Sequence, residues 1–110
     1  MHEIKAIIRP ERLERVLDAL HEITSMPGIT VSEVIGYGRR EPPARSGGIE
    51  YGRVPMTKLE VVVGDSLVAQ AVATIRHAAS TGHPGDGKVF VSVIDQAMSI
   101  RSADEGVEAL

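Results

Sequence analysis

The segment from Gly82 to Lys88 matches the first seven positions of a phosphate-binding P-loop by spacing; it reads Gly-His-Pro-Gly-Asp-Gly-Lys. A P-loop continues with Ser or Thr, which binds magnesium, and with a helix whose N-terminus receives the phosphates. Here Val89 follows and opens an apolar run that predicts a strand, so Walker-type hydrolysis is excluded. What remains is a turn whose glycines let backbone N–H groups approach an anion beside the charge of Lys88. A tight helix-to-strand turn with a solvated lysine explains the same residues at least as well.

Two further groups of residues place positive charge beside flexible backbone. Gly36-Tyr37-Gly38 is followed by Arg39 and Arg40. Glycines that flank an aromatic residue in a strand indicate close approach by another backbone or a ligand, and two arginines beyond them could bind phosphate. A glycine-weakened strand end with solvated arginines fits the pattern equally well. Arg101, late in the chain, is a third cationic candidate, and taken alone it is more typical of a surface residue.

The other titratable residues form no recognisable catalytic or metal-binding pattern. The four histidines show no ligand spacing, and the sequence contains no HExxH or HxxxH motif. There is no cysteine, which excludes thiol catalysis, disulfides and thiolate metal sites. Asp65 and Asp86 lie at predicted cap and turn positions, where a role toward the backbone is sufficient. We therefore predict a protein that is not an enzyme and that holds neither a metal nor a prosthetic group.

Length and composition limit the remaining function classes. With 110 residues, 43% of them hydrophobic and 25% charged, the chain has the size and composition of one globular domain over residues 1–110. A net charge of -3 and only three aromatic residues provide neither a basic surface nor stacking platforms, so nucleic acid is not an expected partner. No apolar run reaches the roughly 18 residues of a membrane span and no signal-like segment opens the chain, which favours a cytoplasmic protein.

Hydrophobic periodicity predicts the elements that must position these residues. Strands are predicted at 3–8, 29–37, 58–63 and 88–94. The first helix is predicted at 10–23 with Pro10 in its first turn, and the second runs from an N-cap at Gly64-Asp65 to Ala78. A long loop at 38–55, a turn-rich connection at 80–87, a short extended piece at 98–102 and a polar tail complete the chain.

This order of elements predicts an α+β fold, the ferredoxin-like βαββαβ plait, in which a four-stranded antiparallel sheet carries two helices on one face. In a monomer of this architecture the other face of the sheet is polar. Here Val61-Val62-Val63 and Val89-Phe90-Val91 place apolar side chains on both faces of their strands, which indicates that the second face is buried as well. We therefore expect a homo-oligomer that packs sheet to sheet in a closed ring.

Several stretches of the sequence together resemble one family, the PII signal-transduction proteins. The most specific stretch is Gly85-Asp86-Gly87-Lys88 followed by an apolar strand, and the others are Ile4 to Pro10, Thr30 to Arg39, Thr81-Gly82 and Ile100-Arg101. Members of this family are trimeric ferredoxin-like sensors of adenine nucleotides. The resemblance implies a homotrimer with a nucleotide cleft between adjacent subunits. It also implies that 38–55 is the family's T-loop, 80–88 its B-loop and 98–110 its C-terminal segment.

Carried over by position, the resemblance implies a set of nucleotide-binding residues. The B-loop holds the phosphates, together with cations from the base of the T-loop and from the C-terminal segment. Apolar residues on the strands surround the adenine. The expected nucleotide-binding residues are Ile7, Thr30, Gly36, Tyr37, Gly38, Arg39, Val62, Gly85, Asp86, Gly87, Lys88 and Arg101.

Three positions differ from the family pattern. Arg40 stands where a glutamine helps to hold magnesium, Met56 replaces the lysine that meets 2-oxoglutarate, and Ser99 replaces one of two phosphate-binding arginines. The loop is also about three residues shorter than usual. These differences favour a divergent member that reads ADP or AMP ahead of magnesium-ATP with 2-oxoglutarate. A small anion such as bicarbonate is a candidate for a second ligand.

The loop at 38–55 is expected to act as the switch of the protein. Its Gly, Pro and Arg content leaves few large apolar groups to hold one conformation, so we predict disorder without ligand. A bound anion would relieve the repulsion among the arginines and order the loop for a target protein, such as a membrane transporter or an enzyme. The residues expected to contact the anion or the partner are Arg40, Arg45, Tyr51 and Arg53, of which Tyr51 also matches the tyrosine that is modified in the family.

Other users of the ferredoxin-like plait fit this sequence less well. An RNA-recognition domain needs aromatic residues on its central strands, and 3–8 and 58–63 contain none. A heavy-metal chaperone needs a cysteine pair, and an acylphosphatase-like enzyme needs an asparagine, a residue that this sequence lacks entirely. An amino-acid-binding regulatory domain is the alternative function that the sequence leaves open, with the acylphosphatase-like enzyme behind it.

Overall fold

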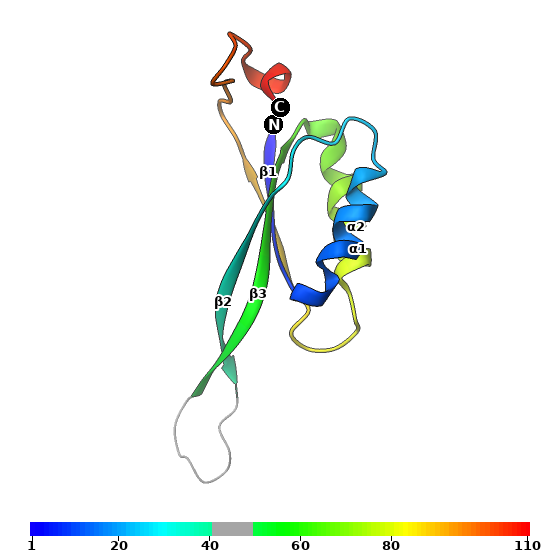
Figure 1. Ribbon diagram of the computed structural model, residues 1–110, viewed down its shortest axis with the longest axis vertical. Coiled ribbons are helices and arrows are strands. Elements are labelled where there is room, and N and C mark those ends of the chain that lie inside the picture. The colour runs from blue at the N-terminus through cyan, green and yellow to red at the C-terminus, as the bar shows by residue number, and fades with distance from the viewer. Residues whose placement is uncertain (41–49) are drawn as a thin grey trace.

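The structure, a computed structural model, describes residues 1–40 and 50–110 (Figure 1). In this part of the chain the strands are β1 (His2–Ile8), β2 (Thr30–Arg40), β3 (Glu50–Val63) and β4 (Gly87–Val93). They form one antiparallel sheet in the order β2-β3-β1-β4. The helices α1 (Leu13–His21) and α2 (Val68–Ala79) pack against each other on one face of the sheet. The predicted ferredoxin-like βαββαβ fold is confirmed.

The core lies between the helices and the sheet because each element buries side chains at its own period. Alternate residues of β1 and β3 point to the helices, and each helix buries residues three or four positions apart. The buried side chains that meet in this layer are Ile4, Ala6, Ile8, Leu59, Val61, Val63, Val16, Leu20, Ala71 and Ile75.

Both helices begin with a short 3₁₀ turn, at Pro10–Arg12 and at Asp65–Leu67. The N-cap residue of the second turn is Gly64, within the predicted Gly64-Asp65 cap, but no side chain bonds to the turn, so the backbone role expected for Asp65 is wrong. Asp65 Oδ1 instead accepts a hydrogen bond from the Met1 ammonium group at 2.8 Å and lies 2.8 Å from His2 Nδ1. The carboxylate therefore ties the N-terminus of the chain to the start of α2.

The predicted loop at 38–55 is wrong in its extent. Residues 38–40 belong to β2 and residues 50–55 to β3, and the ladder continues to the pair Arg40 and Glu50. The expectation of disorder is therefore contradicted for these residues, whereas 41–49, which include Arg45, lie outside the described residues. The physical reason is register: pairing fixed in the core, for example between Val31 and Leu59, continues outward pair by pair. Figure 1 shows this hairpin projecting beyond the helices.

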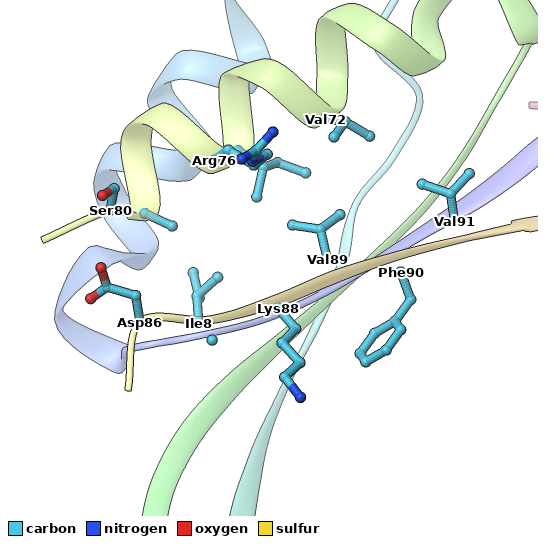
Figure 2. Close-up of a pocket in the computed structure, with 12 residues that line it drawn as sticks. Ile8, Val72, Arg76, Ser80, Asp86, Lys88, Val89, Phe90 and Val91 are labelled. Carbon is cyan, nitrogen blue, oxygen red and sulfur yellow. The ribbon is translucent and has the colours of Figure 1, made fainter. Parts of the chain in front are cut away.

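The face of the sheet away from the helices is mixed, not apolar. Phe90 points away from α2 (Figure 2) and is 53% exposed, and Val62 also lies on this face because its neighbours in β3 are buried. Charged residues alternate with these apolar ones. The expectation of strands that are apolar on both faces thus holds at Val62 and Phe90 but not for the face as a whole. Its charged residues include Lys5, Lys58, Glu60 and Lys88.

The C-terminal segment folds back on itself, whereas a short extended piece at 98–102 was the expectation. Met98 pairs with Glu105 across a turn, Ser99 N donates to Asp104 O at 2.9 Å, and Gly106 N donates to Ala97 O at 2.8 Å. A 3₁₀ turn at Gly106–Ala109 follows. Figure 1 places the C-terminus beside the N-terminus, at the end of the molecule opposite the hairpin.

Candidate functional site

The glycine-rich connection between α2 and β4 needs its glycines for backbone reasons. Gly82, Gly85 and Gly87 have φ values of +82°, +94° and +103°, a region that side chains disfavour. At Gly87 space adds a second requirement, because a Cβ atom there would lie 1.7 Å from the carbonyl oxygen of Ile7. The start of β4 therefore lies directly against the backbone of β1.

Asp86 organises this connection from within. Its carboxylate accepts hydrogen bonds from the backbone N–H of Thr81 at 2.8 Å and of Gly82 at 3.0 Å, and from the hydroxyl of Thr81. These donors, with the Thr81 hydroxyl the most important, hold the pKa of Asp86 far below its ordinary value of 3.8. The carboxylate thus stays ionised and faces the connection itself, so its place in an anion site is to shape the loop.

Arg9, which the sequence patterns did not single out, bonds to the same connection. Its Nε donates to Asp86 Oδ1 at 2.9 Å and its Nη2 donates to the carbonyl oxygen of Pro84 at 2.7 Å. The signal available in the sequence was the position of Arg9, a cation at the end of a strand and directly before Pro10. Such a residue needs a partner, but nothing in the sequence says that the partner is 77 positions away.

Four of the expected nucleotide-binding residues share the helix-free face of the sheet. Ile7 is paired with Lys88, and Figure 2 shows the Lys88 side chain pointing away from α2. Thr30 is paired with Glu60, and Glu60 lies on the same face of β3 as Val62 because the two residues are two positions apart in the strand. This face therefore combines the apolar side chains of Ile7 and Val62, the positive charge of Lys88 and, at Gly87, the end of the glycine-rich connection.

These four residues do not form one compact site within a single chain. Ile7 and Lys88 lie near the glycine-rich connection, whereas Val62 stands four positions beyond Lys58, the β3 partner of Ile7, a separation of roughly 13 Å along the strand. Around Val62, Thr30 and Val62 line a pocket of about 400 Å³. Its other lining residues include Gly28, Glu60, Ala109 and Leu110.

Arg101 lies still farther from Lys88. Lys88 is near the start of β4, and the C-terminal segment that carries Arg101 begins only after Val93, roughly 20 Å along the strand. Figure 1 accordingly shows the C-terminal segment and the glycine-rich connection at opposite ends of β4. Arg101 is exposed. One chain therefore does not bring Lys88 and Arg101 together.

The residues expected at the base of the T-loop lie in the paired arms of the hairpin. Tyr37 pairs with Arg53, Gly38 with Gly52 and Arg39 with Tyr51. Gly36 lies beside Met56, and a Cβ atom at Gly36 would be 3.5 Å from Met56 Cγ, an ordinary contact. Among the described side chains, a Cβ atom at Gly38 would meet nothing within 4 Å.

A larger cleft of about 560 Å³ lies on the other side of β4, between this edge strand and α2 (Figure 2). Its walls are mostly aliphatic, with Val72 and Ile75 from α2 facing Val89 and Val91 from β4. Asp86, Gly87 and Lys88 border the cleft, but the Lys88 side chain points to the opposite face. No pattern in the sequence indicates this cleft, because it depends on how far α2 extends over the sheet edge.

Among residues 1–40 and 50–110, no three histidine or acidic side chains are close enough to hold a metal ion. In the same ranges, no helix has the length and apolar composition required to cross a membrane.

Comparison with known proteins identifies the chain at the level of family. The family model described as nitrogen regulatory protein P-II matches residues 1–104. A nitrogen regulatory protein P-II from Bradyrhizobium diazoefficiens is 45% identical over 113 aligned positions that cover all of both chains. Nitrogen regulatory protein P-II 2 from Methanothermobacter thermautotrophicus is 45% identical, covering all of this chain and 97% of that protein. The solved structure of Bacillus subtilis GlnK superposes with a TM-score of 0.88 at 32% identity, covering 99% of this chain and 97% of that one.

Proposed function

Because the chain belongs to the P-II nitrogen regulatory protein family, we propose that it senses adenine nucleotides for a target protein. The resemblance seen in the sequence is thereby confirmed, and the chain is a regulatory signalling protein and not an enzyme. The proposed effectors are ADP or AMP, with ATP as a weaker ligand. They bind in clefts between the subunits of a homotrimer in the cytoplasm, and the β2–β3 hairpin carries the signal.

The observation that carries this proposal is the placement of Lys88. Lys88 directly follows the glycine-rich connection and is paired with Ile7, and both side chains lie on the helix-free face of the sheet. A positive charge, the backbone of the connection and an apolar side chain therefore lie close together. A nucleotide needs this combination, since its phosphates require donors and positive charge and its base requires apolar contact. Gly85 and Gly87 would supply backbone N–H groups to the phosphates, and Asp86 holds the connection in shape.

In the proposed ring, the neighbouring subunit supplies the site residues that one chain does not bring together. Lys88 lies near the start of β4 and Arg101 follows beyond its end, and head-to-tail contacts that close into a ring would bring one end of each subunit to the other end of the next. Thr30 and Val62 would then complete the adenine surroundings from a neighbour. The exposed apolar side chains along this path also need cover, among them Val93 at 69% and Ile100, which is fully exposed.

The preference for ADP or AMP rests on residues at the hairpin. Arg40 ends β2 with a cation where the family has a magnesium ligand, and the uncharged Met56 is buried in the stem where the family has a lysine. A small anion such as bicarbonate would bind the arginines of the hairpin, including Arg53, which is exposed. Ile35, Tyr37 and Val54 are exposed on the projecting arms and provide a surface for the target protein.

Calorimetry with ADP, AMP and ATP tests the nucleotide site. Lys88→Ala and Arg101→Ala should each weaken ADP binding by about 1 to 3 kcal/mol, the scale of a charge-assisted hydrogen bond, without unfolding the protein. Arg15→Ala is the matched control, because Arg15 is exposed on α1, on the helix side of the sheet. Unchanged ADP affinity in Lys88→Ala would show that the phosphates lie elsewhere.

Mixed subunits test whether Lys88 and Arg101 act across an interface. Light scattering should first give the mass of a trimer. Refolding Lys88→Ala chains together with Arg101→Ala chains should then restore part of the ADP binding that either variant lacks alone. The reason is that some clefts in the mixed ring receive an intact lysine from one chain and an intact arginine from the next. A monomer in solution, or no recovery on mixing, would refute the shared cleft.

A further inference from the structure

We propose that Arg9 is the positioning residue of the glycine-rich connection, holding Pro84 to Lys88 in the conformation that receives the nucleotide phosphates. The inference rests on the proposed function for its ligand, but its structural part can be tested without any nucleotide. Arg9 itself does not belong to the set of residues that the sequence assigned to the site.

The guanidinium of Arg9 holds two separate points of the connection. Nε donates to Asp86 Oδ1 and Nη2 donates to the carbonyl oxygen of Pro84, at 2.9 and 2.7 Å. The side chains of Arg9 and Asp86 are 27% and 26% exposed, and the bond between them is partly buried, whereas the bond to Pro84 is exposed. The Arg9 side chain also lies along Gly85, where a Cβ atom would be 3.4 Å from Nη2. The guanidinium thus holds the stretch from Pro84 to Asp86, part of the connection that is proposed to bind the phosphates.

The backbone of Arg9 is itself restrained. Its φ of -64° and ψ of 136° are extended, as the residue before a proline requires, and Pro10 opens the 3₁₀ turn that leads into α1. Arg9 therefore starts from a fixed direction at the end of β1. A rigid, planar fork on a fixed backbone can set the position of a loop, whereas a flexible single-point cation cannot.

The same junction secures the rest of the connection. Gly87 lies against the carbonyl oxygen of Ile7, and Arg12 Nη2 donates to the carbonyl oxygen of Ser80, where α2 ends. Both ends are thus held by residues 7–12, and Arg9 holds the middle. Thr81 and Gly82 donate to the carboxylate of the same Asp86, so loss of Arg9 would release Pro84 and Gly85 and also free Asp86 to move away from the Thr81 and Gly82 amides.

The test compares Arg9→Met, Arg9→Lys and the control Arg15→Met by two measurements. Hydrogen exchange of the Thr81 and Gly82 amides in nucleotide-free protein should be faster in Arg9→Met and unchanged in Arg15→Met. Unchanged exchange in Arg9→Met would overturn the positioning role whether or not the protein binds nucleotide. This arm therefore separates a failure of the inference from a failure of the proposed function.

Calorimetry with ADP forms the second arm. Arg9→Met should lose roughly tenfold in ADP affinity, the scale of one charge-assisted hydrogen bond, while Arg15→Met binds as the wild type does. Arg9→Lys should stay well below the wild type, because one ammonium group cannot bond Asp86 and Pro84 in the geometry of the fork. Full ADP affinity in Arg9→Met, or full recovery in Arg9→Lys, would overturn the claim, the latter by showing that charge alone is sufficient.

Discussion

Gly87→Ala is expected to be strongly destabilising, because Gly87 has the closest Cβ contact among the glycines evaluated in the described part of the chain. The added Cβ atom would lie 1.7 Å from Ile7 O and 2.8 Å from Ile7 C, whereas real Cβ atoms essentially never come within 3.0 Å of such atoms. The start of β4 must therefore move more than 1 Å away from β1, which breaks ladder hydrogen bonds at about 1 kcal/mol each. The φ of +103° adds about 1 to 2 kcal/mol of backbone strain.

Together these costs lower the free energy of unfolding by about 3 to 5 kcal/mol, a large share of the ~5 to 15 kcal/mol of an ordinary domain. The melting temperature should then fall by roughly 15 to 30 °C, measured by circular dichroism. Gly82→Ala is the matched control, because φ is +82° there but a Cβ atom would meet nothing within 4 Å. It should lose only about 1 kcal/mol. A Gly87→Ala protein that melts within a few degrees of Gly82→Ala would refute the argument from the Ile7 carbonyl.

Two predictions concern carboxylates. Because the pKa of Asp86 is lowered in the folded state, its ionised form stabilises the protein above about pH 4, and this contribution is lost as the pH falls below the ordinary value of 3.8. The difference in urea midpoint between the wild type and Asp86→Asn should therefore shrink from pH 7 to pH 3, and an equal difference at both values would contradict the assignment. The Met1 ammonium group, and next His2, lower the pKa of Asp65 in the same direction, so Asp65→Asn should show the same sign. Its effect should be smaller because the Asp65 side chain is 73% exposed, and a residue added before Met1 should mimic it in urea unfolding.

The fold could be predicted from the sequence because its signals are local and agree with one another. β1 alternates buried and outward residues from Ile4 to Ile8, and the helical spacing around Val16 and Leu20 matches the buried face of α1. The turn chemistry of the glycine-rich connection was equally readable, since three of its glycines have positive φ. What the pattern could not give was the use of each polar side chain. Asp65 had the residue type of a helix cap, but a charged ammonium group brought close by the fold was the stronger partner.

Arg9 and Arg101 show the two limits of reading a site from sequence. The partner of Arg9 is 77 positions away, and only the antiparallel pairing of β1 with β4 brings Asp86 beside it. Arg101 could be assigned by resemblance, yet no single chain places it near Lys88. Periodicity describes one chain, whereas the proposed site is completed by a second copy. If the proposed shared cleft exists, the predicted set of residues is necessarily incomplete within one chain.

The hairpin shows why composition alone misjudged the segment at 38–55. Glycine, proline and arginine predict a loop, but they are also tolerated in an exposed two-stranded ladder. Pro55 lies opposite Ile35 at a point where β1 has already ended, since Ile8 pairs with Thr57, so one side of β3 needs no N–H donor there. The arms are therefore continuous with the core strands. In the proposed mechanism, β3 carries Lys58 beside Ile7 at the nucleotide face and Arg53 in the hairpin. A nucleotide that shifts Lys58 would therefore also move Arg53, because both residues belong to the same continuous strand, β3.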